Sequence, residues 1–262
     1  MAEAIINGVI SGGLAKPEDI SVGEILEDRC RYLTNKYRIY ATPNNSTVIN
    51  KGDFVILCIK PQNLKDIGSV LASSLSSNQT VISIMAGVRM STLMASLNHS
   101  RLIRVMPNTP AQIGAGMTLW QCSPNVDSDV ADQTQSILKT MGDEIRVEEE
   151  QYIDMATALS ASGPAYVFTF IESLIDAGVY IGLSREMASR LTLQTVLGSA
   201  RLVLESTSHP AELRNRVTSP GGTTSEALLA LEEGSFRSTI MNAVVAAYEK
   251  SMSFVDEGTR SQ

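Results

Sequence analysis

The sequence predicts two successive domains: an α/β domain with a doubly wound parallel sheet over residues 1–150, and an all-helical domain over residues 151–262. In the first half, short β-rich runs alternate with helical stretches, which is the pattern of a parallel sheet covered on both faces. Beyond Glu150 no alternating or β-branched run follows, and long stretches with the 3.6-residue period of helices take over.

Seven short runs rich in apolar and β-branched residues are the expected strands. In chain order they are residues 20–22, 38–40, 54–59, 80–85, 102–106, 116–120 and 144–147. A helix is expected over residues 127–141, between the last two. The run 54–59 is apolar at every position, which suits a strand buried on both faces, so we expect it near the middle of the sheet.

Three apolar helices are expected in the second half. The first opens at Ser162 and Pro164, with a capping residue and a proline in its first turn. The others include residues 193–204 and 236–247. Because they carry more apolar surface than they can bury on one another, we expect a homodimer through this domain, or a higher oligomer. Packing against the first domain alone is the alternative.

Composition excludes several classes of partner. The chain has 262 residues, 44% of them hydrophobic, and a net charge of −7 with no block of Lys and Arg, which disfavours nucleic acid. Its apolar runs are shorter than the roughly 18 to 20 residues that a membrane helix needs, so no membrane partner is expected. The first residues lack the basic and apolar regions of a secretory signal, which favours a cytoplasmic protein.

Neither cysteines nor histidines point to a metal site. Cys30, Cys58 and Cys122 are widely spaced, and we interpret all three as structural. Neither His99 nor His209 has a cysteine or a carboxylate near it at the spacing that metal ligands have. We therefore expect no metal and no Ser-His-Asp hydrolase.

Ligands of an open parallel sheet bind beyond the carboxyl ends of its strands. Three expected strands are each followed by small or rigid residues that let a flat cofactor approach the backbone. These residues are Lys60, Pro61 and Gln62, then Ala86 and Gly87, then Asn108 and Thr109. Each segment alone is compatible with a plain turn or cap, but the three together favour a nucleotide-binding crevice.

The helical half contains two polar, glycine-bearing segments, residues 160–166 and 217–224, each where a helix is expected to begin. In the second segment, Thr223, Thr224 and neighbouring backbone N–H groups lie at a positive helix end, which suits a carboxylate. Gly221 and Gly222 let a substrate approach the backbone. A plain capped turn is the alternative.

These motifs resemble the pyrroline-5-carboxylate reductases, and the resemblance runs from Met1 to about Val255. The residues from Pro210 to Glu232, with VTSPGGTT at their centre, fit the signature spacing of that family, and VMPNTP, SASGPAY and IKPQ support it. The resemblance implies a Rossmann-type domain and a helical dimerisation domain. It also implies reduction of 1-pyrroline-5-carboxylate to L-proline by NADPH or NADH, the last step of proline biosynthesis.

The same resemblance implies roles for individual residues. Ser219, Thr223 and nearby N–H groups would hold the substrate carboxylate, with Gly221 and Gly222 beside them, and the Thr224 hydroxyl would bond the ring nitrogen and help deliver a proton. Lys60, Pro61, Gln62, Ala86, Gly87, Asn108 and Thr109 would line the nicotinamide and ribose side of the cofactor.

The sequence departs from the family at its start, where a strand running into G-x-G-x-x-G is expected and absent. Met1 falls at the helix that follows this loop in the family, so we expect an N-terminally truncated member from a shortened reading frame. A naturally shortened form is the alternative. Cofactor preference is open, because Glu24 would favour a free ribose 2′-OH whereas Arg29 and Arg31 would meet a 2′-phosphate.

Two rival functions are compatible with a two-domain chain of this kind. A β-hydroxyacid dehydrogenase uses a lysine on the helix that enters the second domain, and residues 151–183 contain none. A non-enzymatic dimeric relative that has lost cofactor binding stays open.

Overall fold

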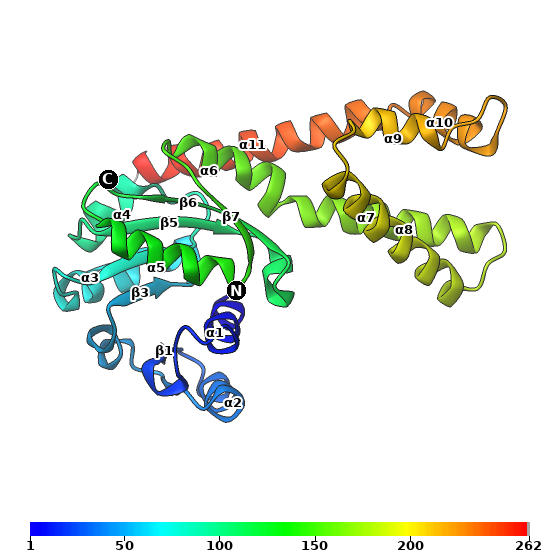
Figure 1. Ribbon diagram of the computed structural model, residues 1–262. Coiled ribbons are helices and arrows are strands. Elements are labelled where there is room, and N and C mark those ends of the chain that lie inside the picture. The colour runs from blue at the N-terminus through cyan, green and yellow to red at the C-terminus, as the bar shows by residue number, and fades with distance from the viewer. Residues whose placement is uncertain (261–262) are drawn as a thin grey trace. The chain divides into compact units, whose positions relative to one another are not determined.

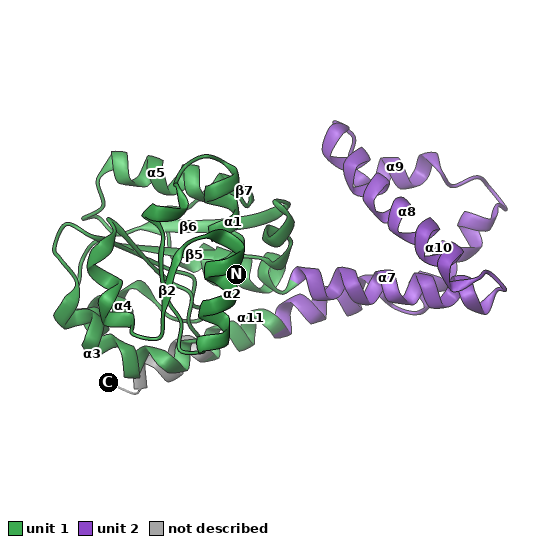
Figure 2. Ribbon diagram, turned by 90° about the horizontal axis from the view of Figure 1, so that it is seen from below, with its two compact units in different colours: residues 1–162, 247–262 green, residues 163–246 purple. Residues whose placement is uncertain are grey.

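The computed structural model describes residues 1–260, with side chains as far as Ser253. The chain forms two compact units: unit 1 is Met1–Ser162 with the segment that begins at Ala247, and unit 2 is Gly163–Ala246 (Figure 2). Strands end at Arg146 and helices follow from Gln151, as the sequence indicated. The domain boundary at residue 150 stays a prediction, because the two units are defined by contacts.

Unit 1 contains all seven expected strands in two sheets (Figure 1). A five-stranded sheet has the order β3 (Phe54–Leu57), β4 (Thr80–Ser83), β5 (Leu102–Pro107), β6 (Gly116–Cys122) and β7 (Gly142–Arg146). A second, parallel sheet pairs β1 (Ser21–Gly23) with β2 (Tyr40–Thr42). The expectation of one wholly parallel sheet is therefore wrong in part.

The exception to parallel pairing is β6, which runs antiparallel to β5. Only the short 3-10 turn Thr109–Ile113 lies between these strands, whereas a parallel connection needs a crossover of about a dozen residues or more. β7 pairs in parallel with β6, because the helix α5 (Ser128–Lys139) supplies the crossover that this pairing needs. Both strands therefore run opposite to β5.

The position expected for the run 54–59 is also wrong. β3 lies at an edge of the five-stranded sheet, with its first three residues only half-buried, whereas every residue of β4 and β5 is buried. The apolar sequence indicates a strand that can be buried on both faces. It does not indicate which other strands pair with it.

Helices cover both faces of the five-stranded sheet, which confirms the doubly wound class. Alternate residues of β4 face opposite ways: Ile82 packs in a core with α1 (Ala2–Ser11) and α5, and Val81 in a core with α3 (Leu64–Ser74) and α4 (Met90–Leu97). This alternation follows from the two-residue period of a strand. α2 (Glu27–Tyr37) contributes Leu33 to a small core beside the second sheet, together with Ile6 of α1 and Ile39, which directly precedes β2.

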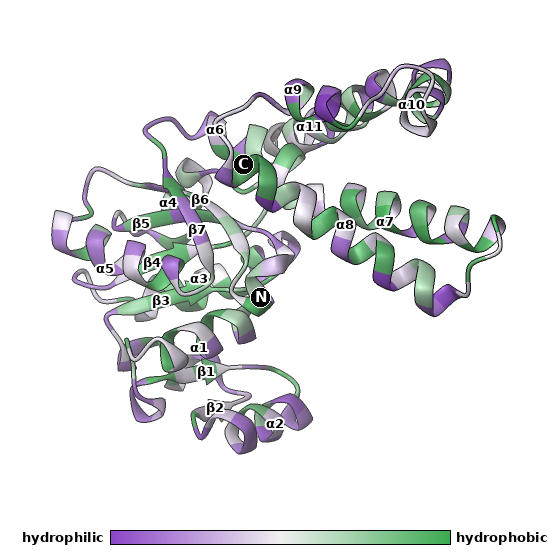
Figure 3. Cartoon of the chain, turned by 45° about the vertical axis from the view of Figure 1, so that its right-hand side comes forward, coloured by the Kyte–Doolittle hydropathy of each residue, from purple (hydrophilic) through white to green (hydrophobic). Residues whose placement is uncertain are grey.

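Unit 2 is wholly helical, as expected. Its helices are α7 (Gly163–Tyr180), α8 (Arg185–Glu205), α9 (Pro210–Arg216), α10 (Thr223–Glu233) and the first part of α11 (Phe236–Arg260). α7 and α8 pack together at Gly178, where a Cβ atom would lie 2.9 Å from that of Ala188. Hydrophobic residues are frequent along α7 and alternate with hydrophilic ones along α8 (Figure 3), and several large ones, such as Phe168 and Leu204, are exposed.

Helix α7 begins at Gly163 within segment 160–166, as expected, but the residues before it are helical as well. The chain is helical from α6 (Gln151–Ala156), passes through a π-turn at Thr157–Ala161, and continues into α7. The Ser162 N–H donates to the Thr157 carbonyl over 2.9 Å, which is the wider spacing of a π-turn. Pro164 has no N–H to donate to Ser160, so a break in regular helical bonding is expected there.

One helical run among the described residues, Gln151–Tyr180, is long and apolar enough to cross a membrane, with mean hydropathy 1.2 over its most apolar window. The sequence expectation of no such segment rested on uninterrupted apolar runs. Asp154, Glu172 and Asp176 interrupt this one. Length and composition alone are weak evidence for a membrane helix, since core helices of soluble proteins have the same properties.

Candidate cofactor and substrate sites

The three loop segments predicted for the cofactor lie at one edge of the sheet in unit 1. β3, β4 and β5 are adjacent and parallel, so their carboxyl ends meet there. Lys60 caps a short 3-10 turn that begins at Pro61, and Ala86 is exposed. Gly87 has φ of 72°, a left-handed conformation that glycine adopts without strain, and it turns the chain after β4. A flat ligand could approach the backbone at these loops.

Asn108 directly follows β5, and both the oxygen and the nitrogen of its side-chain amide form hydrogen bonds. Its Oδ1 accepts from the Met117 N–H at 2.9 Å, and its Nδ2 lies 3.4 Å from both the carbonyl and the hydroxyl oxygen of Ser160. The Ser160 carbonyl is the group that the proline at position 164 leaves without its regular helical donor. Asn108 thus joins two motifs, VMPNTP and SASGPAY, that lie far apart in sequence.

A buried ion-pair network lies just before this contact and was missed by the sequence reasoning. Arg104 on β5 is 1% exposed, and its guanidinium donates to Asp154 and Glu150 at 2.7 Å each. Arg89 adds a bond to Asp154 at 3.1 Å. An arginine in the otherwise apolar run Leu102 to Met106 was the available signal, because a buried charge requires a partner.

The two arginines considered for a 2′-phosphate are already paired. Arg29 forms an ion pair with Glu3, and Arg31 forms one with Asp28. Glu24 follows β1 as expected, and its side chain accepts from the Leu26 N–H at 3.1 Å. Because both arginines already have carboxylate partners, neither needs a ligand phosphate to pair its charge. The preference between NADPH and NADH stays open.

Glu3 itself gathers an unusual number of donors. Lys36 lies 2.8 Å away, the hydroxyl groups of Tyr37 and Tyr32 lie at 2.8 and 3.0 Å, and Arg29 completes the group. The Lys36 ammonium is the largest influence and, with the other donors, lowers the pKa of Glu3 to about 2 against the opposing effect of partial burial. Glu3 therefore ties α1 to α2.

Cysteine and histidine environments agree with structural roles. All three cysteines are free, and burial raises the pKa of the Cys58 thiol to about 11. A thiol of that kind is a poor nucleophile at neutral pH. His209 caps α9, where its Nδ1 accepts from the Ala211 N–H at 3.2 Å, and His99 bonds the Gln79 carbonyl at 2.8 Å.

The substrate segment predicted in unit 2 forms a tight turn into α10. Gly221 has φ of 67°, and the Gly222 N–H donates to the Ser219 carbonyl at 3.0 Å. The Ser225 hydroxyl donates to the same carbonyl at 2.7 Å. Thr223 and Thr224 are the first two residues of α10, so their N–H groups precede any intrahelical acceptor.

The structure thus gathers the predicted residues into two groups. The cofactor group, residues 60–62, 86–87 and 108–109, belongs to unit 1, and the substrate group, residues 219–224, belongs to unit 2. Within each group the residues lie together, as the sequence predicted from strand ends and from a helix start. Their roles stay predictions.

The known proteins that this chain matches align with the residues of both the cofactor group and the substrate group. Residues 150–254 match the family described as pyrroline-5-carboxylate reductase dimerisation, and residues 1–87 match the family described as NADP oxidoreductase coenzyme F420-dependent. The pyrroline-5-carboxylate reductase of Synechocystis is 41% identical over 251 residues, covering 96% of this chain and 93% of the relative. That of Escherichia coli is 39% identical, with the same two coverages.

Solved structures agree with these relatives. The pyrroline carboxylate reductase of Plasmodium falciparum, solved with NADP bound, has a TM-score of 0.86 and 34% identity, covering 97% of this chain and 94% of that one. That of Coxiella burnetii has a TM-score of 0.84 and 36% identity, with the same coverages. Sequence, fold and coverage agree across both units, and this chain belongs to the pyrroline-5-carboxylate reductase family.

Proposed function

We propose that this chain reduces 1-pyrroline-5-carboxylate to L-proline with NADPH or NADH. The observation that carries the proposal is the VTSPGGTT segment. It forms a glycine-bearing turn into α10 within the region that matches the pyrroline-5-carboxylate reductase dimerisation family. Curated relatives of nearly the same length are named for this reaction.

The loops at the carboxyl edge of the sheet fit a nicotinamide cofactor. Ala86 is small and exposed, Gly87 turns away in a left-handed conformation, and Asn108 is held rigidly by its two partners. A bound reduced nicotinamide would supply the hydride. Lys60, Pro61, Gln62, Ala86, Gly87, Asn108 and Thr109 would hold its nicotinamide and ribose side in a fixed orientation, which contributes to rate through positioning.

The turn into α10 fits a small carboxylate. The first-turn N–H groups of Thr223 and Thr224 lie at the positive end of an 11-residue helix, where an anion is stabilised. The Ser219 hydroxyl adds a donor, and Gly221 and Gly222 present no side chain to exclude a ligand. We assign Thr224 to the ring nitrogen, where its hydroxyl would help deliver the proton that completes reduction.

The test is turnover by the purified, folded chain. Oxidation of NADPH or NADH that depends on added pyrroline-5-carboxylate, with proline as the product, is the expected result. Cofactor binding without oxidation would contradict the proposal.

The competing function is that of a dimeric relative without catalysis. It predicts that the folded chain binds neither NADPH nor NADH, which calorimetry would show directly. Measuring cofactor binding beside turnover therefore separates the two functions.

We further propose that the chain assembles as a homodimer, or a higher oligomer, through unit 2. The described residues of α7, α8, α10 and α11 expose many large apolar side chains, and the whole of unit 2 lies in the matched dimerisation region. Subunit packing also accounts for the apolar run Gln151–Tyr180 without a membrane. The proposed ligands are small molecules, and a cytoplasmic location stays a prediction.

A further inference from the structure

Four charged side chains of unit 1 form a network that joins three separate segments. Arg104 on β5 donates to Glu150 and Asp154 at 2.7 Å each. Arg89, which directly precedes α4, donates to Asp154 at 3.1 Å. Two positive charges thus meet two negative ones, and the network links the start of α4, the middle of β5 and the start of α6.

The first loop that the network reaches is the one after β4. Arg89 is the N-cap residue of α4, but its side chain makes no capping bond. Instead, Oε1 of Glu150 accepts from the N–H of Met90, the first residue of α4, at 2.7 Å. A helix start leaves such N–H groups unpaired and favours a negative charge beside them. Glu150 therefore fixes the point at which loop 86–87 enters α4.

The second loop that the network reaches follows β5. Asp154 on α6 is held through both carboxylate oxygens, Oδ1 by Arg104 and Oδ2 by Arg89. The helical run continues from α6 through the π-turn to Ser160, whose carbonyl and hydroxyl oxygens lie 3.4 Å from the amide nitrogen of Asn108. Arg104 lies on the strand that ends just before Asn108. Asn108 is thus held both through its own strand and through α6.

Stability alone does not account for these charges. Arg104 and Asp154 are each 1% exposed. Burying two ions costs free energy that their attraction only partly offsets, so apolar side chains of similar volume are often equally or more stabilising. Nε of Arg104 also has no hydrogen-bond partner among the residues whose side chains are described. The property that apolar side chains lack is direction, because a guanidinium with carboxylate partners fixes orientation as well as distance.

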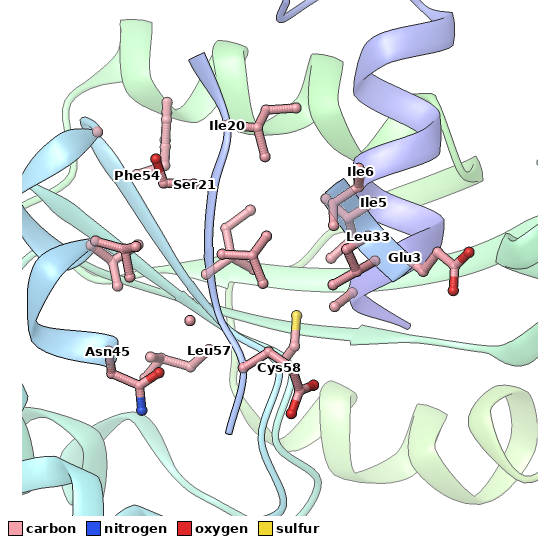
Figure 4. Close-up of a pocket in the computed structure, with 18 of the residues that line it drawn as sticks. Glu3, Ile5, Ile6, Ile20, Ser21, Leu33, Asn45, Phe54, Leu57 and Cys58 are labelled. Carbon is pink, nitrogen blue, oxygen red and sulfur yellow. The ribbon is translucent and has the colours of Figure 1, made fainter. Parts of the chain in front are cut away.

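A large cavity elsewhere in unit 1 does not involve the network. Its volume is about 2680 Å³, β1 and β3 border it, and Figure 4 shows Ser21 and Phe54 among its lining residues. None of the four charged side chains is among the described residues that line it. The role of the network therefore lies in the segments that it joins.

We propose that Arg104, Glu150 and Asp154 are positioning residues for hydride transfer, which hold loop 86–87 and Asn108 in a fixed arrangement on the nicotinamide side of the cofactor. They act through these two segments and touch neither cofactor nor substrate. A misplacement of about 1 Å can lower the rate of a reaction about 10²-fold, because the reacting atoms lose their alignment. The kinetic part of this proposal rests on the proposed reduction of 1-pyrroline-5-carboxylate.

The first experiment replaces Glu150 with Gln in the full chain, which keeps the shape and removes the charge that pairs with Arg104. Exchange of the Met90 amide hydrogen, followed by NMR without cofactor, is expected to become roughly tenfold faster. Turnover should fall roughly tenfold, whereas the KM for 1-pyrroline-5-carboxylate should stay within about twofold, since the substrate group is not displaced. Glu148→Gln is the matched control on a nearby exposed carboxylate and should change none of these quantities.

The second experiment separates positioning from stability. The double variant Arg104→Met with Asp154→Val replaces the buried pair by apolar side chains of similar total volume. Its urea midpoint is expected to stay near that of the wild type. Exchange of the Met117 amide hydrogen, which bonds Asn108, should nevertheless become roughly tenfold faster. Turnover per folded subunit should stay roughly tenfold below the wild-type value.

Two sets of outcomes keep the reaction and the positioning role apart. A wild-type chain that oxidises no cofactor would contradict the proposed function, and exchange at Met90 and Met117 would then decide the positioning role by itself. If the double variant does not fold, Glu150→Gln decides it alone.

Either of two results would overturn the positioning role. One is unchanged amide exchange at Met90 and Met117 in the variants. The other is turnover that stays at the wild-type level in Glu150→Gln, or in a double variant of wild-type stability, because the network would then be structural only.

Discussion

At the scale of single residues, Glu3 shows how one carboxylate can connect two helices. It accepts from Lys36, Arg29 and two tyrosine hydroxyls, which all come from α2, while Glu3 itself lies in the first turn of α1. A carboxylate near a helix N-terminus is favoured by the helix dipole as well. Sequence spacing could not reveal this cluster, because its members lie 26 to 34 positions apart.

Replacing Glu3 with Gln should make stability less dependent on acid pH. The folded-state pKa of Glu3, about 2, lies below the ordinary value of 4.5, so its contribution is fully present above pH 4.5 and is lost as pH falls toward 2. Because these contacts are partly exposed, we expect a neutral-pH loss of about 1 kcal/mol. Urea unfolding at several pH values measures it, with Glu249→Gln as a control on an exposed carboxylate. A difference that persists unchanged at pH 2 would contradict the assignment.

Thr224 is the residue to which we assign proton delivery. Thr224→Ala should lower turnover by about 10²-fold, as expected for loss of a positioned proton donor, while the affinity for reduced cofactor changes little. Thr224→Ser keeps the hydroxyl and should retain most of the activity. Steady-state kinetics and cofactor titration give the two quantities. Equal losses of turnover and cofactor affinity in Thr224→Ala would instead indicate a structural residue.

At the scale of elements, the Arg104 network holds α6 to β5. Arg104 and Asp154 are both 1% exposed, and Glu150 precedes the first residue of α6. The π-turn that follows places Ser160 against Asn108. We infer that the network positions these two motifs relative to each other.

Arg104→Ala should destabilise the chain by about 3–5 kcal/mol, because it leaves Asp154 buried without its partner. Arg101→Ala is the matched control, because Arg101 directly precedes β5 and also forms an ion pair. Its partner Asp127 is 70% exposed, so the expected loss is only about 0–1 kcal/mol. Denaturant midpoints compare the two variants, and equal midpoints would show that the buried network contributes no more than a surface pair.

Element type was largely predictable from the sequence, and element pairing was not. All seven expected strands exist, because apolar and β-branched runs between turn residues are local signals. The reversal of β6 and the edge position of β3 depend on how far the connecting segments reach and on which neighbours are present. The π-turn before Pro164 likewise follows from a missing hydrogen bond, because Pro164 has no N–H to donate to the Ser160 carbonyl.

At the scale of the whole molecule, unit 2 exposes more large apolar side chains than a monomer is expected to carry. Phe168 on α7 is 60% exposed, and Met241 on α11 is 67% exposed. Both lie within the residues that match the dimerisation family.

Replacing Phe168 and Met241 with Glu should dissociate the oligomer, since each places a charge in a surface that we expect to be buried between subunits. Ile145→Glu is the control, because Ile145 is 50% exposed on β7 in unit 1. Sedimentation velocity measures the mass. A wild-type monomer, or an unchanged mass in the double variant, would contradict a dimer through these helices.

By itself, the sequence determined the two kinds of domain, the strands and helices, and the family, because these depend on local periodicity and on contiguous motifs such as VTSPGGTT. It also placed each group of candidate ligand residues at a strand end or a helix start. Only the tertiary structure decided that Arg104 meets Asp154, that Glu3 collects four donors, and that β1 and β3 border one cavity. The physical reason is that these contacts join residues far apart in the chain, and packing alone brings such residues together.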